Sequence, residues 1–229
     1  MSTLPWTNLN QINIVFNQNV NVTESSLQLL GVNVPNYSFS GFSFNSTTDT
    51  ATWTLSAPIT DDKLLIDLSD AVTSTSTGFA LDGSWTDGVS TYPSGTGTPG
   101  SNFMFSLNVL PGDVNQSGGV NILDTVHVIG LSGSSTSTPA MYSIFSDVNG
   151  SGGINILDIL ATNSQAGSTL PAGTPVVPTF SSLVAAVAAQ TTAIAGQPQL
   201  FSTLPASTNP LLQHRRFGGR SVLANSPKD

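Results

Sequence analysis

Two copies of one polar stretch hold most of the side chains that could do chemistry. The copies begin at Asp113 and Asp147, 34 residues apart, and share the pattern D-V-N-x-S-G-G-[VI]-N-I-L-D. Oxygen-bearing side chains stand at pattern positions 1, 3, 5, 9 and 12, and glycine stands at position 6. Carboxylates, amides and hydroxyls are the ligands that hard divalent cations such as calcium prefer. The spacing therefore predicts a calcium site in each copy, rather than two polar turns that bind nothing.

The spacing also assigns a role to each position, because it is that of a twelve-residue EF-hand calcium loop. In such a loop position 7 provides a carbonyl oxygen, and position 9 binds directly or through water. The predicted ligands are Asp113, Asn115, Ser117, Gly119, Asn121, Asp124, Asp147, Asn149, Ser151, Gly153, Asn155 and Asp158. Gly118 and Gly152 at position 6 are expected to adopt positive φ. Each loop has two carboxylates, enough to neutralise one Ca²⁺, so we expect two bound ions.

Each predicted loop runs into a short helix that must position its last ligand. Apolar residues recur at helical spacing from Ile122 to Ile129, and again from Ile156 to Leu160. Two interpretations of the first apolar pair of each helix stay open: an internal core, or an exposed site for a partner. These pairs are Ile122, Leu123, Ile156 and Leu157. Val120 and Ile154, at position 8, are expected to pair as a two-stranded ribbon. So small a core predicts that calcium binding and folding are coupled.

Two such loops, each followed by one short helix and lacking an entering helix, resemble a type I dockerin across residues 110–167. The resemblance implies two calcium-bound loop–helix units with near twofold symmetry that bind a cohesin domain on another protein. Because dockerins often accompany polysaccharide-degrading enzymes, it also implies an association with polysaccharide breakdown. The sequence departs from the family at position 5, where Ser117 and Ser151 replace Asp. It also has apolar Ile-Leu pairs where the family often has small polar pairs, and no basic residue follows either loop.

Residues 1–109 have the pattern of short strands. Apolar and polar residues alternate within 11–16, 37–44, 50–55 and 102–109, while 63–68 is more continuously apolar. Residues 45–49 form a predicted turn between two of these strands. So many short strands favour an antiparallel β-sandwich, with the aromatic stripe of residues 37–44 in its core.

Four short stretches of this region, 14–20, 50–55, 64–72 and 78–83, resemble bacterial Ig-like domains of the surface-layer type. The resemblance implies a spacer or adhesive module on a cell surface. The last strand leads through Val109 directly into the first calcium loop, so we expect the two modules to keep a fixed relation when calcium is bound.

A Gly/Ser/Thr/Pro-rich stretch, 87–101, is interpreted as a solvated connection rather than a binding loop.

Composition limits the possible functions. The chain has 229 residues, a net charge of −8 and no cysteine, and no basic residue lies between Leu64 and His214. The lack of basic residues excludes a nucleic-acid-binding surface on the body of the protein. The lack of cysteine excludes any disulfide or thiolate metal site. No stretch has the roughly 20 apolar residues of a membrane span. The N-terminus shows no signal peptide. Because weakly charged loops need plentiful calcium, we nevertheless expect an extracellular or cell-surface location, with this chain the C-terminal part of a longer exported protein.

The C-terminal residues 168–229 differ in composition, with many Pro and Ala residues. They are interpreted as a linker with one short helix at 181–195 and a disordered tail. No motif of a nucleophile, metalloprotease or phosphate loop is present, so the chain is predicted to be non-catalytic. Two other interpretations stay open: a calcium-stiffened structural or adhesive spacer next to another module of the same protein, and a sandwich that itself binds carbohydrate.

Overall fold

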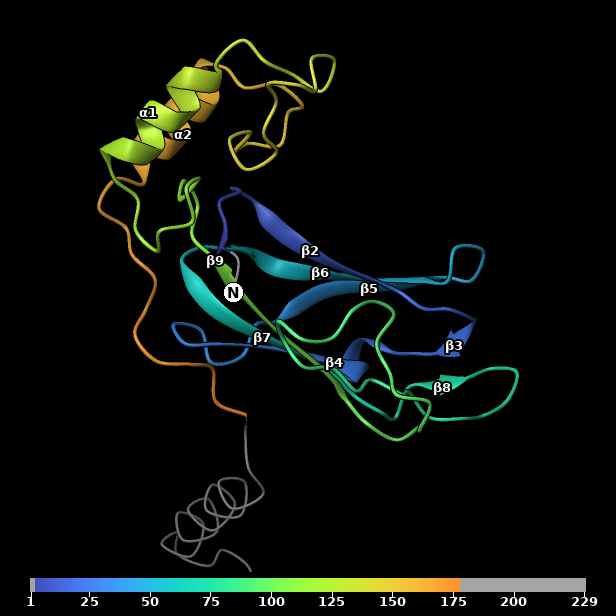
Figure 1. The fold of residues 1–229 in the computed structure, drawn as a ribbon. Coiled ribbons are helices and arrows are strands. Elements are labelled where there is room, and N and C mark those ends of the chain that lie inside the picture. The colour runs from blue at the N-terminus through green and yellow to red at the C-terminus, as the bar shows by residue number, and fades with distance from the viewer. Residues whose placement is uncertain (1–2, 178–229) are drawn as a thin grey trace, which may run out of the picture. The chain divides into compact units, whose positions relative to one another are not determined.

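The computed structural model describes residues 3–177, which form a β-rich N-terminal part followed by a small helical part (Figure 1). The elements are β1 (Thr3–Leu4), β2 (Leu9–Val15), β3 (Val20–Asn21), the 3-10 helix η1 (Glu24–Ser26), β4 (Leu27–Gly31), β5 (Phe39–Asn45), β6 (Thr50–Ile59), β7 (Asp62–Leu68), β8 (Thr73–Ser74), β9 (Phe103–Val109), α1 (Ile122–Leu131) and α2 (Ile156–Ser164). The predicted helix 181–195 and most of the predicted tail lie outside the described residues.

The N-terminal part is a two-layer β-sandwich, which confirms the mainly β fold (Figure 1). One sheet has the strand order β1-β9-β7-β4, the other has the order β2-β6-β5, and β3 and β8 form a small separate pair. Both layers contribute to one core, in which Trp53 of β6 packs with Leu68 of β7 and Phe103 of β9. Burial of these large apolar side chains is the main force that holds the layers together.

The predicted hairpin within the second sheet is confirmed. β5 and β6 pair in antiparallel fashion with Asn45 opposite Thr50, across the predicted turn. Burial alternates along β6, so that Ala51 and Trp53 are buried between the layers. The buried indole N–H of Trp53 donates to the carbonyl of Glu24 at 3.0 Å, which satisfies its one polar group.

One strand contact departs from the predicted antiparallel pairing, at one edge of the sandwich. β1 pairs in parallel with the last strand, with Thr3 opposite Asn108 and Leu4 opposite Val109. Two residues are too few to show an alternation in the sequence, and Pro5 ends the strand directly. The parallel contact places the start of the sandwich beside the chain segment that enters the first calcium loop.

A buried carboxylate that the sequence pattern did not predict fixes one end of the sandwich. Asp62 is fully buried, and its carboxylate accepts from four main-chain amides at 2.8–3.1 Å and from the Tyr37 hydroxyl at 2.8 Å. Burial, this hydrogen bond and the negative charge of Asp62 together raise the pKa of Tyr37 above its ordinary value. The carboxylate therefore organises the loop between β4 and β5, where it is the acceptor for the amides of Asn33 and Val34.

The helical part has a small core of its own. Val114, Val128, Val148 and Ile154 are buried together. The helices α1 and α2 lie side by side (Figure 1). The two loop–helix segments supply equivalent residues, since Val114 and Val148 occupy the same position of the repeat, as do Val120 and Ile154. Among the described residues, neither helix is long and apolar enough to cross a membrane.

Candidate metal centres and helix face

The predicted ligands of the first loop converge in the structure. Asp113 accepts from the amides of Ser117 at 2.8 Å and Gly118 at 3.0 Å. The Ser117 hydroxyl lies 3.1 Å from the Gly119 carbonyl oxygen and 3.5 Å from Asp113, and its amide donates to the Asn115 side-chain oxygen at 2.9 Å. Oxygen atoms of loop positions 1, 3, 5 and 7 therefore lie close together around one turn of the main chain.

The second loop repeats this arrangement. Asp147 accepts from the amides of Ser151 at 2.9 Å and Gly152 at 2.7 Å, and the Ser151 hydroxyl lies 3.1 Å from the Gly153 carbonyl oxygen. The predicted positive φ at position 6 is present in both copies, with 85° at Gly118 and at Gly152. One difference separates the loops: the Tyr142 hydroxyl donates to Asp147 at 2.7 Å.

Positions 9 and 12 of each loop also begin the helix. Asn121 is the N-cap of α1 and accepts from the Leu123 amide at 2.8 Å, while Asp124 accepts from the Asn121 amide at 2.9 Å. Asn155 and Asp158 make the same reciprocal pair in front of α2. This is a capping box. The asparagine oxygen is engaged by the helix, which favours coordination through water at position 9 over direct coordination.

Electrostatics in both loops favour a bound cation. The four carboxylates at positions 1 and 12 are at most 1% exposed, and the sequence offers no basic residue between Leu64 and His214. Burial raises the pKa of Asp113, the amides of Gly118 and Ser117 lower it, and the charge of Asp124 raises it, with a net upward shift. Two buried carboxylates without a countercharge are costly. One divalent cation in each loop would remove that cost.

The donor set fits calcium in particular. Every predicted ligand atom is an oxygen, and the described residues contain no cluster of three or more His, Cys, Asp or Glu side chains. Zinc and copper sites would require nitrogen or sulfur ligands. A hard cation held by two carboxylates and neutral oxygens suits the set best, and its chemistry here would be to hold each loop in shape.

The predicted ribbon between Val120 and Ile154 does not form. Instead each position 8 pairs with the segment that follows the other helix. The Val120 amide donates to the Ser168 carbonyl at 2.9 Å, and the Ile154 amide donates to the Ser134 carbonyl at 2.9 Å. Ser134 and Ser168 are themselves 34 residues apart, so the pairing is reciprocal and follows the repeat. This pairing also places residues 168–170, which were expected to belong to the linker, against the first loop.

Both helices bury several polar side chains and expose most of their large apolar side chains, although Val128 of α1 is buried. Asp124, Thr125, Asp158 and Thr162 are buried, whereas Ile122, Leu123, Ile156 and Leu157 are 59–68% exposed. The remaining members of this apolar face are Val126, Ile129 and Leu160. Against the core interpretation, the internal core uses Val128 instead of the Ile-Leu pairs. We call the seven exposed side chains the helix face.

The second loop is also joined to the sandwich. The Thr7 amide donates to the Val148 carbonyl at 2.9 Å, and the Trp6 indole donates to the Ile144 carbonyl at 2.8 Å. The Trp6 ring stacks on Phe145, with ring centres 5.8 Å apart. No pattern in the sequence predicts this joint, because Trp6 stands alone before the first predicted strand.

Of the comparisons with known proteins, the family model agrees with the loop geometry. The family model of the dockerin type I domain matches residues 111–164. The comparison with curated proteins gives no match. Among solved structures, two type II cohesin–X–dockerin complexes from Acetivibrio cellulolyticus, a C-terminal and an N-terminal interface mutant, are similar to this chain at 14% identity. Each match covers 70% of this chain and 97% of the other, with TM-scores of 0.27 and 0.26. The family match confirms the resemblance seen in the repeat, and residues 111–164 are therefore a dockerin type I domain, a protein-interaction module.

Proposed function

We propose that this chain is a non-catalytic docking protein whose helix face binds a cohesin-like domain of a partner, while two calcium ions hold its loops in shape. The single observation that carries the proposal is the reversed polarity of α1 and α2, which bury carboxylates and expose seven large apolar side chains. A contiguous apolar surface of this kind marks an interaction site in a small protein. Ile122 and Ile156, Leu123 and Leu157, and Val126 and Leu160 are equivalent positions of the repeat.

Calcium has a structural role in this proposal. The core of the module is small, and the last ligand of each loop is also the third residue of its helix. Binding of the ion would fix the helix start and with it the spacing of the exposed side chains. Loops with only two carboxylates suit modules that work outside cells, where calcium dissociation constants are about 10⁻⁴–10⁻³ M. We therefore place the protein outside the cell, where a partner could link it to polysaccharide breakdown.

The proposal is tested by binding to a panel of recombinant cohesin domains, measured by calorimetry with calcium and again with EDTA. We expect binding to at least one of them with calcium only. The paired substitutions Ile122→Asp and Ile156→Asp should abolish it without changing the number of calcium ions bound. Val89→Asp replaces a side chain that is 77% exposed on the sandwich and serves as the matched control. Binding that survives the double substitution would contradict the proposed face.

A calcium-stiffened spacer is the second candidate, and the joint around Trp6 favours it. This joint ties the second predicted calcium loop to the first residues of the sandwich through three hydrogen bonds and one ring stack. A spacer would bind no cohesin. It would still show calcium-dependent protection from proteolysis between residues 105 and 150, and Trp6→Ala should remove that protection.

A further inference from the structure

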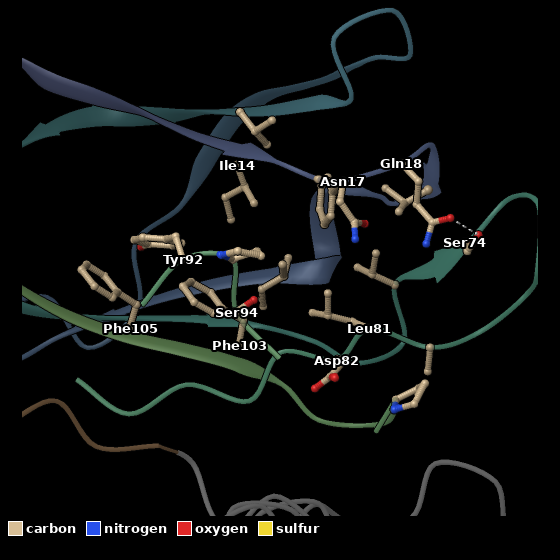
Figure 2. A pocket seen from close by; sticks show the side chains of 18 of the residues that line it. Ile14, Asn17, Gln18, Ser74, Leu81, Asp82, Tyr92, Ser94, Phe103 and Phe105 are labelled. Carbon is tan, nitrogen blue, oxygen red and sulfur yellow. Dashed lines mark hydrogen bonds between the residues drawn. The ribbon is translucent and has the colours of Figure 1, made fainter. Parts of the chain in front are cut away.

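A cleft opens between the two layers of the sandwich, and none of its lining residues belongs to the two repeated loops. Its volume is about 630 Å³, within the range of ligand sites. Figure 2 shows Ile14 of β2 on one side and Phe103 and Phe105 of β9 on the other, with Tyr92 between them. Tyr92 is 69% exposed, so the cleft is open to solvent at this ring. Apolar side chains of the core are therefore accessible to solvent along one margin of the sandwich.

The margin on the β2 side is a free sheet edge. β2 pairs only with β6, since the sheet order is β2-β6-β5. The Phe16 amide donates to the Asp49 carbonyl at 2.8 Å, towards the β6 side. Main-chain groups of alternate residues point to opposite edges of an antiparallel strand. The N–H and C=O groups of Gln11, Asn13 and Val15 therefore point away from β6, and within residues 3–177 no hydrogen bond to another segment uses them.

This edge lacks the usual protection against strand pairing. Sheet edges are commonly blocked by lysine, by proline or by inward-pointing charges. The sequence Leu9–Val15 contains no charged residue and no proline, and Val15 is 71% exposed. The opposite margin differs, because the Ser106 amide of β9 donates to the Asp87 carboxylate at 3.0 Å. One margin is thus closed by the chain itself, and the other is open.

We propose that the β2 edge and the cleft together bind an extended peptide segment of a partner protein by strand addition. The peptide main chain would pair with Gln11, Asn13 and Val15, which span about five residues at roughly 3.4 Å each. Every second side chain would then enter the cleft over Ile14 and Phe16. Main-chain pairing supplies affinity and the cleft supplies selectivity for alternate side chains.

The lining of the cleft restricts the chemistry of the peptide. Its polar members are neutral amides and hydroxyls together with Asp82, and no basic residue lines it. The Asp82 carboxylate is held at the rim by the amides of Thr96 at 2.9 Å and Gly97 at 2.6 Å. An acidic side chain entering the cleft would lie near this carboxylate without a countercharge. The inward positions should therefore be uncharged, and β-branched or similar apolar residues suit the depth.

The test uses the full chain labelled with ¹⁵N and the peptide acetyl-TVTVTVT-amide as the probe. We expect millimolar peptide to shift the amide signals of Gln11, Asn13 and Val15 and to slow their exchange with solvent. Asn13→Pro removes one outward N–H and should weaken binding about tenfold, whereas Asn13→Val keeps the N–H and should stay within twofold. Circular dichroism and the melting temperature verify that both variants fold.

A second peptide separates strand addition from simple occupation of the cleft. It has the same sequence, with N-methyl groups on the amides of its pairing edge. We expect this peptide to leave the β2 signals unchanged, independently of how the Asn13→Pro variant folds. Equal binding of both peptides would overturn the proposal and assign the cleft to small apolar molecules. Unchanged β2 signals with the unmethylated peptide would overturn it as well.

Discussion

Asp124 illustrates how one short side chain serves two purposes. Its carboxylate is fully buried, it caps α1 through the Asn121 amide, and it faces Asp113 across the loop. Asp158 of the second copy likewise caps its helix and is a predicted calcium ligand. An aspartate at the last loop position therefore satisfies the helix start and leaves its charge for a cation. The places of these side chains in the loop could be predicted from the spacing, because local loop chemistry fixes them; that they bind calcium stays a prediction.

The Asp124→Asn substitution separates these purposes. It keeps an oxygen that can cap α1 but removes one of the two negative charges of the first loop. Because calcium affinity depends on ligand charge, we expect the affinity of this loop to fall by roughly tenfold or more, with little loss of helix. Calorimetry together with circular dichroism measures both quantities. Asp158→Asn is the matched variant and should affect the second loop alone.

Asp62 is the residue-scale feature that sequence analysis missed. In the sequence it stands beside Asp61 at an apparent turn, and only the fold reveals that it is buried against four amides. Asp62→Ala should lower the free energy of unfolding of the sandwich by about 3 kcal/mol, because several partly buried donors lose an acceptor. Urea denaturation measures this loss. Asp61→Ala changes a partly exposed neighbour and should cost little by comparison.

At the scale of elements, sequence periodicity predicted most of the structure. The strands at 50–55 and 63–68 and both helices are present, because alternation and helical spacing reflect which face each element buries. The parallel β1 contact and the pairing of Val120 with Ser168 were not predicted. Both join segments far apart in the chain through main-chain groups. Such contacts depend on the assembled fold and leave no pattern of side chains.

The reciprocal pairing makes the first loop depend on the segment after α2. A chain that ends at Ala166 lacks Ser168 and Thr169, which pair with Val120 and Gly119. We expect this truncation to weaken calcium binding at the first loop and to spare the second, whose partner segment at Ser134 remains. A chain that ends at Val177 keeps the pairing and is the control. Equal loss at both loops would contradict the reciprocal arrangement.

At the scale of the whole molecule, the sandwich and the dockerin domain differ in what holds them. The sandwich has a continuous core with contributions from both sheets, whereas the dockerin domain has a small core and four buried carboxylates. Calcium at 100 times its dissociation constant would add about 2.7 kcal/mol per site to folding. The ions should therefore determine the stability of one part and hardly affect the other.

EDTA should consequently divide the thermal unfolding of the protein into two transitions. The first, at lower temperature, should belong to residues 111–170, and the second should remain close to that of the sandwich with calcium. The stacked rings of Trp6 and Phe145 lie at the joint, so tryptophan fluorescence should report part of the first transition. Calorimetric melting with and without calcium measures the effect. One transition, shifted as a whole, would indicate that the two parts unfold together.

Calcium titration by isothermal calorimetry tests the central claim most directly. We predict two bound ions per chain for the natural sequence, one for Asp113→Ala or Asp147→Ala, and none for the double substitution. The carboxylates of these residues are each held by two amides of their own loop, so each change should act on one site. No bound calcium in the natural protein, or two ions in the double variant, would contradict the account.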